Sequence, residues 1–384
     1  MNERRINAWL EAGIIDQKAA EGIRAYEAAH SRPIALWAVV GLAALAIGLG
    51  LVSVVAANWD AIPGQVRLGL HLALLAAGAA WLWWKGPDLE GDHPWFHEAA
   101  LFVFGLLGLT FFGHVGQVYQ TDAPLWQPLA GWLVLFAPLF LLRGQSWLTA
   151  AAVFVILVWA AWDHASFDRL LDNRDIASGE RARLALITGL PVLLAPLAAW
   201  KRGTSMRPAF WRRLRQMAVS YAVLGASLLA ISAGVEFDSS REAATRALPA
   251  VGTWALIAIV SASLVMLLRP TLGGRATAMV LGVSGTIAIF SNMLTGSQIA
   301  GAALFMLLWA AIAWASLWGG WRRLFQLAVG VLAFRIVILS LEFNEDLLTS
   351  GLGLIVSGLL GLAVAWGAMR VSRRYAPAAG GDSE

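Results

Sequence analysis

One charged residue interrupts an apolar run near the end of the chain, and its chemistry raises the first functional question. Arg335 lies within LAVGVLAFRIVILSLEF, residues 327–343, and Glu342 follows seven residues later, two turns along the same helix face. A guanidinium keeps its charge, and placing one at mid-membrane depth costs about 2.5–3.5 kcal/mol. Arg335 is therefore either a structural residue that reaches an interface or an ion-pair partner, or a binding group that faces a hydrated cavity.

Further polar side chains follow or begin other apolar segments, and these could act together with Arg335. Aspartate and histidine side chains could carry protons, and arginines could attract an anionic group. Each also has a structural explanation as a cap, an interfacial anchor or a hydrogen-bonding partner of a neighbouring helix. No catalytic residue is assigned. We predict one substrate-binding site, open to the external face and lined by Arg335, Glu342, Arg67, His71, His114, Gln117, Tyr119, Gln120, Asn58, Trp59 and Asp60.

The composition indicates the kind of protein that must position these residues. Of the 384 residues, 59% are hydrophobic and only 14% are charged, the mean hydropathy is +0.68, and the chain is rich in tryptophan, with 20 residues. The apolar segments are about 17–24 residues long, the length that a helix needs to cross a hydrocarbon core. We therefore predict an all-α, polytopic membrane protein. No cleavable signal peptide is expected, and a chain with 0 cysteines has no disulfides.

Twelve membrane spans are predicted, with both the N- and C-terminus cytoplasmic. This orientation places 20 of the 28 Lys and Arg residues on the inner side and seven outside, and Arg335 is the remaining one. Such a bias is what the positive-inside rule requires. The predicted spans are 34–57, 66–84, 98–114, 125–142, 146–162, 183–200, 217–235, 250–268, 276–291, 298–318, 324–341 and 350–369.

Little of the chain is predicted to lie outside the membrane. Residues 1–32 form an expected cytoplasmic helical hairpin, in which Gly13 ends the first helix and Asp16 caps the second. The hairpin is too small to fold alone and could bind a cytoplasmic protein partner. Residues 33–371 form the membrane bundle, and 372–384 form a disordered cytoplasmic tail. The basic residues flank spans, so the expected partners are membrane lipids and not nucleic acid.

Several motifs bear on chemistry and packing. The chain has no H-E-x-x-H, no P-loop and no nucleophile elbow, so neither a metal nor a cofactor is expected. Glycines spaced three or four apart in GLGLIVSGLLGLAVAWG, residues 351–367, favour close helix packing. WRRLRQMAV (211–219) and WRRLFQLAV (321–329) agree at seven of nine positions, and either a duplication or chance explains the agreement.

Three stretches carry a resemblance to a known family: AWLEAGII (8–15), VVAANWDAIP (54–63) and GHVGQVYQTDAPLW (113–126). They are similar to an uncharacterised family of bacterial inner-membrane proteins defined only as a domain of unknown function. The resemblance covers roughly the first 145 residues. It implies a multi-pass protein of the bacterial inner membrane, and it implies no activity.

Three functions fit these observations. The first, which we favour, is transport or lipid handling through a cavity open to the external face. The second is an outer-face enzyme, resembling a glycosyltransferase, in which arginines hold the phosphate of a lipid-linked substrate. The third is a non-catalytic scaffold or sensor whose N-terminal hairpin recruits a partner. The outer loops are short for an enzyme, so an enzymatic role is the less expected one.

Overall fold

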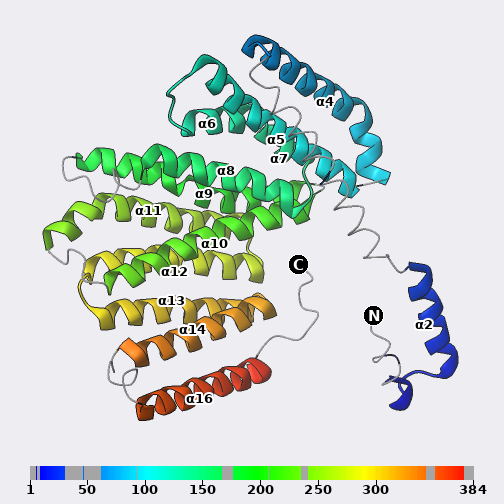
Figure 1. Ribbon diagram of the computed structural model, residues 1–384. Coiled ribbons are helices and arrows are strands. Elements are labelled where there is room, and N and C mark those ends of the chain that lie inside the picture. The colour runs from blue at the N-terminus through cyan, green and yellow to red at the C-terminus, as the bar shows by residue number, and fades with distance from the viewer. Residues whose placement is uncertain are drawn as a thin grey trace. The chain divides into compact units, whose positions relative to one another are not determined.

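The computed structural model describes residues 6, 9–30, 46, 62–92, 94–166, 176–205, 207–234, 241–342 and 351–375. Within these residues all regular secondary structure is helical, so the predicted all-α class is confirmed. The helices, shown in Figure 1, are α2 (Gln17–His30), α4 (Gly64–Asp92), α5 (Pro94–Tyr119), α6 (Trp126–Leu135), α7 (Ala137–Arg143), α8 (Trp147–Ala165), α9 (Ser178–Thr204), α10 (Pro208–Ala233), α11 (Arg241–Leu268), α12 (Leu272–Met293), α13 (Gln298–Trp318), α14 (Arg322–Glu342) and α16 (Gly351–Tyr375).

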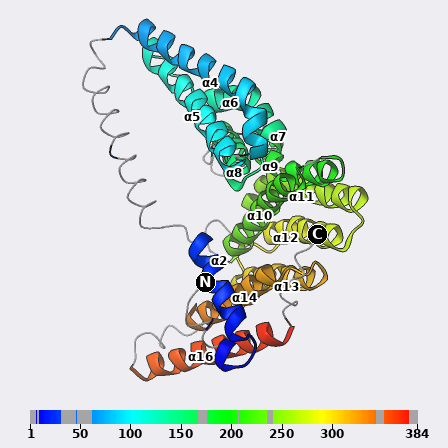
Figure 2. The same cartoon turned by 90° about the vertical axis from the view of Figure 1, so that its right-hand side faces the viewer.

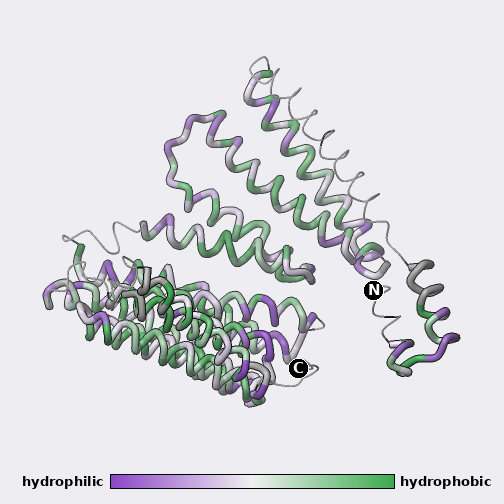
Figure 3. The backbone as a smooth tube through the Cα atoms, turned by 60° about the horizontal axis from the view of Figure 1, so that its bottom comes forward, coloured by the Kyte–Doolittle hydropathy of each residue, from purple (hydrophilic) through white to green (hydrophobic). Residues whose placement is uncertain are grey.

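Eight of the described helices are long and apolar enough to cross a membrane, and α6 with α7 forms a ninth candidate that is bent by 40°. These nine correspond to the predicted second to tenth spans. Helices α14 and α16 lie at the predicted eleventh and twelfth spans. The predicted first span lies outside the described residues. Along the helices the middle is mostly hydrophobic and the hydrophilic residues gather near the ends (Figure 3), as a bilayer requires.

The chain divides into two compact units, residues 1–67 and 68–384. In the first unit, Gly13 adopts a left-handed φ of 67°, and the backbone N–H of Ile14 donates to the Trp9 carbonyl at 2.9 Å. The backbone N–H of Ala19 donates to Oδ1 of Asp16 at 2.7 Å. The predicted glycine stop and aspartate cap are therefore confirmed.

The second unit is a succession of packed helices. From α8 to α16 the helices follow one another in approximately their chain order, as Figures 1 and 2 both show. Helix α10 is central, because it packs against α8, α9, α12 and α13. The core at these contacts is rich in alanine, and Ala222, Ala226, Ala255 and Ala288 are fully buried. Small side chains let helix backbones approach closely, which is how helices associate where lipid removes most of the hydrophobic driving force.

Two glycines show how close these approaches are. A Cβ added at Gly285 would lie 2.8 Å from the Ala255 carbonyl oxygen, and one at Gly301 would lie 2.7 Å from that of Ala230. Because the neighbouring atoms belong to the backbone, neither could move aside easily. The predicted close packing of the last glycine-rich segment is different: a Cβ added at 358, 361 or 367 meets no described atom within 4 Å. At these three positions the described residues therefore show no close contact, although α16 packs against α14.

Loops predicted on one side of the membrane lie together in the second unit. At one end, the backbone N–H of Trp126 donates to Asp163 at 2.7 Å, which joins the predicted outer ends of the fourth and fifth spans. At the other end, Arg207 donates to the Gly144 carbonyl at 2.6 Å, which joins two predicted inner loops. This grouping follows from helices that alternate in direction.

Candidate functional site

The candidate site lies between α4 and α5, which run antiparallel. Residues later in α4 contact residues earlier in α5. A Cβ added at Gly78 would lie 3.2 Å from the Phe104 ring, and the rings of Trp81 and Phe96 are 6.0 Å apart. Proline begins both helices: α4 follows Pro63 and α5 starts at Pro94, positions where the missing N–H costs no hydrogen bond.

Two predicted site residues meet in this helix pair. His71 of α4 and His114 of α5 are 43 residues apart in the chain, and their Nδ1 atoms lie 3.1 Å apart. The Nε2 atom of His71 lies 3.0 Å from the Leu107 carbonyl oxygen. The two imidazole rings meet edge to face with centroids 5.4 Å apart, and the Phe111 ring meets His71 in the same way. Both histidines are half-buried.

The partners of His71 determine which nitrogens carry protons. A carbonyl oxygen only accepts, so Nε2 of His71 must donate to Leu107. In a neutral His71, Nδ1 then accepts, and the proton in the bond between the rings belongs to Nδ1 of His114. One extra proton is compatible with this bond, because the charge can reside on either ring while a single proton remains between the two Nδ1 atoms. A second extra proton would place an N–H on both Nδ1 atoms, so neither could accept and the hydrogen bond between the rings would break.

The pair can therefore bind one proton and pass it from one helix to the other. Transfer along the Nδ1 to Nδ1 bond moves the positive charge from the ring of His114 to that of His71 without changing the number of protons held. Imidazoles are the side chains whose charge changes in the physiological pH range. Ionisable groups within membrane helices are expensive and are associated with ion and proton pathways. The arrangement is chemically suited to proton binding and relay.

The other residues predicted near α4 and α5 have separate places in the described structure or lie outside it. Arg67, one turn before His71, donates from Nε to the Ile62 carbonyl at 2.6 Å. Gln117 and Tyr119 are exposed near the end of α5, and Gln120 ends that segment with a φ of 48°. Asn58, Trp59 and Asp60 lie outside the described residues, as does the side chain of Glu342.

Arg335 lies apart from the histidines. It is half-buried on α14, a helix that packs mainly against α13 and α16, whereas α5 packs mainly against α6 and α8. In Figures 1 and 2, α8 to α13 lie between α5 and α14. The structure therefore brings His71 and His114 together and does not bring Arg335 to them.

A second polar cluster was not anticipated from the sequence, and it lies at the other end of α5. Glu98 is only 6% exposed. Its carboxylate accepts hydrogen bonds from the backbone N–H groups of Gln145 (2.5 Å) and Ser146 (3.0 Å) and from the Thr149 hydroxyl (2.7 Å). These donors surround the start of α8, where unpaired N–H groups and the helix dipole favour a negative charge. Glu98 thus fixes α5 to the first turn of α8.

Charged residues of three segments complete this cluster. The Glu90 carboxylate of α4 accepts hydrogen bonds from the Arg143 guanidinium at 3.1 Å and from the side-chain amide of Gln145 at 3.0 Å. Arg207, just before α10, donates to the carbonyls of Gly144 and Leu141. Burial lowers the pKa of Arg207 from its ordinary value, and the charges of Glu90 and Glu98 oppose that shift. The sequence feature that could have indicated a buried acid is the carboxylate at the start of an apolar run, HEAALFVF (97–104).

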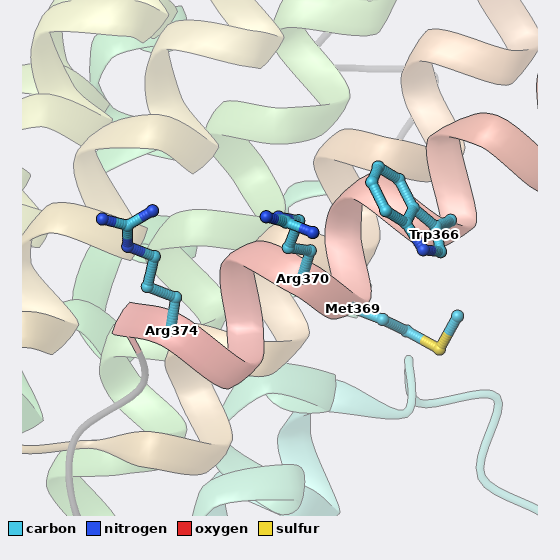
Figure 4. A pocket seen from close by; sticks show the side chains of 4 residues that line it. All are labelled: Trp366, Met369, Arg370 and Arg374. Atoms are coloured by element: carbon cyan, nitrogen blue, oxygen red, sulfur yellow. The ribbon is translucent and has the colours of Figure 1, made fainter.

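A shallow hollow lies at the end of α16, lined by Trp366, Met369, Arg370 and Arg374 (Figure 4). The guanidinium of Arg370 lies over the Trp366 ring, 5.3 Å from its centroid. Arg370 and Arg374 point the same way from successive turns, as Figure 4 shows. Arginine and tryptophan together at a helix end are typical of an interfacial anchor.

Long apolar helices in this number, with polar groups at their ends, define a multi-pass integral membrane protein. Residues 7–149 match a family model described as "Predicted membrane protein (DUF2157)", a family of unknown function. The resemblance expected from the sequence is therefore confirmed. The matched region contains the histidine pair and Glu98 with its donors. No curated protein and no solved structure matches the chain.

Proposed function

We propose that this protein transports a solute, or handles a lipid, in the bacterial inner membrane, and that the His71–His114 pair is its proton-binding element. The observation that carries the proposal is the 3.1 Å contact between two imidazoles on different membrane helices. A transporter needs an element with two arrangements that a bound ion biases. One extra proton preserves this contact and a second breaks it, which gives α4 and α5 two such arrangements.

The proposal includes twelve spans with both termini in the cytoplasm. The distribution of Lys and Arg supports this orientation, and the grouping of alternate loops supports the alternation of the helices. In this orientation the histidine pair lies near the external ends of α4 and α5. Residues 1–32 form the cytoplasmic hairpin, available to a protein partner, residues 33–371 form the bundle, and residues 372–384 form the tail.

The remaining predicted binding residues have different places in this proposal. Gln117, Tyr119 and Gln120 lie near the same end of α5 as His114 and contribute to an external binding surface. Arg335 acts elsewhere, since α14 does not adjoin α5. An enzyme that holds a lipid phosphate between Arg335 and Arg67 beside His114 is therefore not favoured by the arrangement of the helices.

Proteoliposomes test the proposal. Purified protein is reconstituted, and charge movement is recorded on supported membranes when inorganic phosphate, short carboxylates or amino acids are added at several pH values. Lipid translocation is followed with fluorescent phospholipids and dithionite. We expect at least one response in the wild type, with a pH dependence that is lost when His71 and His114 are both replaced by glutamine. Deletion of residues 1–30 should leave that response in place.

His164→Gln provides the matched control, because His164 lies on α8 and its ring contacts that of Trp126 with centroids 4.7 Å apart. The control variant should keep the wild-type pH dependence. A wild-type protein that responds to no member of the panel and moves no lipid contradicts the proposal, as does a response whose pH dependence survives in the double variant.

A further inference from the structure

The first two turns of α10 bury two hydrogen-bond donors that have no acceptor among the described residues. Trp211 is 4% exposed and Arg215 is 6% exposed, so both are more than nine-tenths buried. The indole Nε1 of Trp211 and the Nη1 of Arg215 each have no hydrogen-bond partner in the described part of the chain. The two residues are four apart in one helix, so their side chains lie on the same face, one turn apart.

Two neighbouring arginines of the same segment, Arg207 and Arg213, differ from Arg215 because they have protein acceptors. Arg207 donates to two backbone carbonyls, and Arg213 donates to the carbonyl of Gln145 and lies over the Trp147 ring. The backbone carbonyls near the end of α7 and just before α8 accept the hydrogen bonds of these two arginines. Arg215 and Trp211 are buried in the packing of α10 on its neighbours, and no acceptor of the described residues reaches the two nitrogens.

The charges around Arg215 are positive. Arg202 at the end of α9, Arg269 just after α11 and Arg212 on α10 are the charged residues that act on its guanidinium most strongly. Three segments therefore bring cations to one place: the end of α9, the start of α10 and the turn between α11 and α12. A buried guanidinium beside other guanidinium groups is costly unless an anion compensates it.

The corresponding helix start shows that burial at this position does not require arginine. In WRRLFQLAV (321–329), the residue that aligns with Arg215 is Phe325, which is 4% exposed. An apolar side chain therefore fills the equivalent place in α14 while the rest of the motif is nearly unchanged. Packing alone therefore does not explain why a charged residue occupies position 215.

We propose that Trp211 and Arg215 bind a phosphate group, with Arg202, Arg212 and Arg269 supplying the surrounding positive charge. A phosphate offers several strong acceptor oxygens, and arginine is suited to it because of its planar array of donors. The indole N–H can only donate, so it suits an acceptor of the same kind. Both a phospholipid headgroup of the adjacent leaflet and soluble phosphate present this chemistry. The site is independent of the histidine pair.

Binding to full-length protein in detergent tests the site. Native mass spectrometry with phosphatidylglycerol, and with phosphatidylcholine as the neutral comparison, measures lipid retention, and calorimetry with inorganic phosphate measures the soluble ligand. The variants are Arg215→Met, which keeps the size and removes the charge, Trp211→Phe, which keeps the ring and removes the N–H, and Arg215→Lys. Arg370→Met is the matched control, since it removes an exposed arginine from α16.

We expect a wild-type affinity for a phosphate-bearing probe that falls about tenfold or more in Arg215→Met and in Trp211→Phe, because each loses a bond to a charged group. Arg215→Lys should retain part of the affinity, and Arg370→Met should retain all of it. Retention of phosphatidylglycerol assigns the phosphate to a lipid headgroup, and binding of inorganic phosphate alone assigns it to a solute. Should Arg215→Met fail to fold, the comparison of Trp211→Phe with the wild type decides.

The proposal is overturned if neither probe binds the wild type. It is equally overturned if a probe binds the wild type, Arg215→Met and Trp211→Phe with the same affinity, since the anion would then be held elsewhere.

Discussion

Replacing Glu98 with glutamine should destabilise the protein by about 1–5 kcal/mol, although the side chain keeps its size. In the wild type, one carboxylate oxygen accepts from Gln145 and the other from Ser146 and Thr149. A glutamine has one oxygen, and its amide nitrogen is a donor. Whichever way the amide is turned, at least one buried donor loses its acceptor, which costs about 1–3 kcal/mol. Losing the negative charge at the start of α8 costs about 0.3–2 kcal/mol more.

The measurement is reversible unfolding in mixed detergent and dodecyl sulfate micelles, followed by tryptophan fluorescence. Glu90→Gln is the control, because its carboxylate pairs with the Arg143 guanidinium at 3.1 Å in a more exposed place. Partly exposed ion pairs contribute at most about 1 kcal/mol. A loss below about 1 kcal/mol for Glu98→Gln, or one no larger than that of the control, would refute the assignment of Glu98 as the residue that fixes α5 to α8.

Three further predictions concern packing, local structure and topology. Gly105→Ala should destabilise by about 1–3 kcal/mol, because a Cβ there would overlap the Phe140 ring. Gly113→Ala on the same helix meets no atom of the described residues within 4 Å and should not destabilise, and chemical unfolding compares the two variants. Asp16→Ala should cost α2 about 1 kcal/mol, seen as faster hydrogen exchange at the Ala19 amide. Because the chain has 0 cysteines, Asp122→Cys and Gly203→Cys report topology directly: a membrane-impermeant maleimide should label position 122 in intact cells and position 203 only after lysis, and the reverse pattern contradicts the orientation.

The helices of the second unit could be predicted from apolar length alone, since a segment of about 20 apolar residues has few other stable forms. The break between α6 and α7 was not predicted. Residues 125–142 read as one span, yet α6 ends at Leu135 and the second helix starts at Ala137. Pro138 lies in the first turn of α7, where its missing N–H removes the bond that would have continued the helix.

The binding site could be predicted only in part, because sequence indicates the depth of a residue in the membrane better than it indicates which helices are neighbours. His71 and His114 were placed at the same end of consecutive spans, which are joined by a short connection, and they do meet. Arg335 was placed at a similar depth, but its helix packs against α13 and α16. Glu98 was missed because its role depends on N–H groups at the start of α8. Backbone donors cannot be recognised from the residue types in a sequence.

The shared proton between His71 and His114 is the central claim, and nitrogen NMR tests it most directly. With histidine labelled by ¹⁵N, a proton held between two ring nitrogens produces a scalar coupling across the hydrogen bond. We predict a correlation between Nδ1 of His71 and Nδ1 of His114 that is absent in His114→Gln and that persists when one extra proton is bound, then disappears on further acidification. Two histidines that titrate independently, without any such correlation at any pH, would contradict the account.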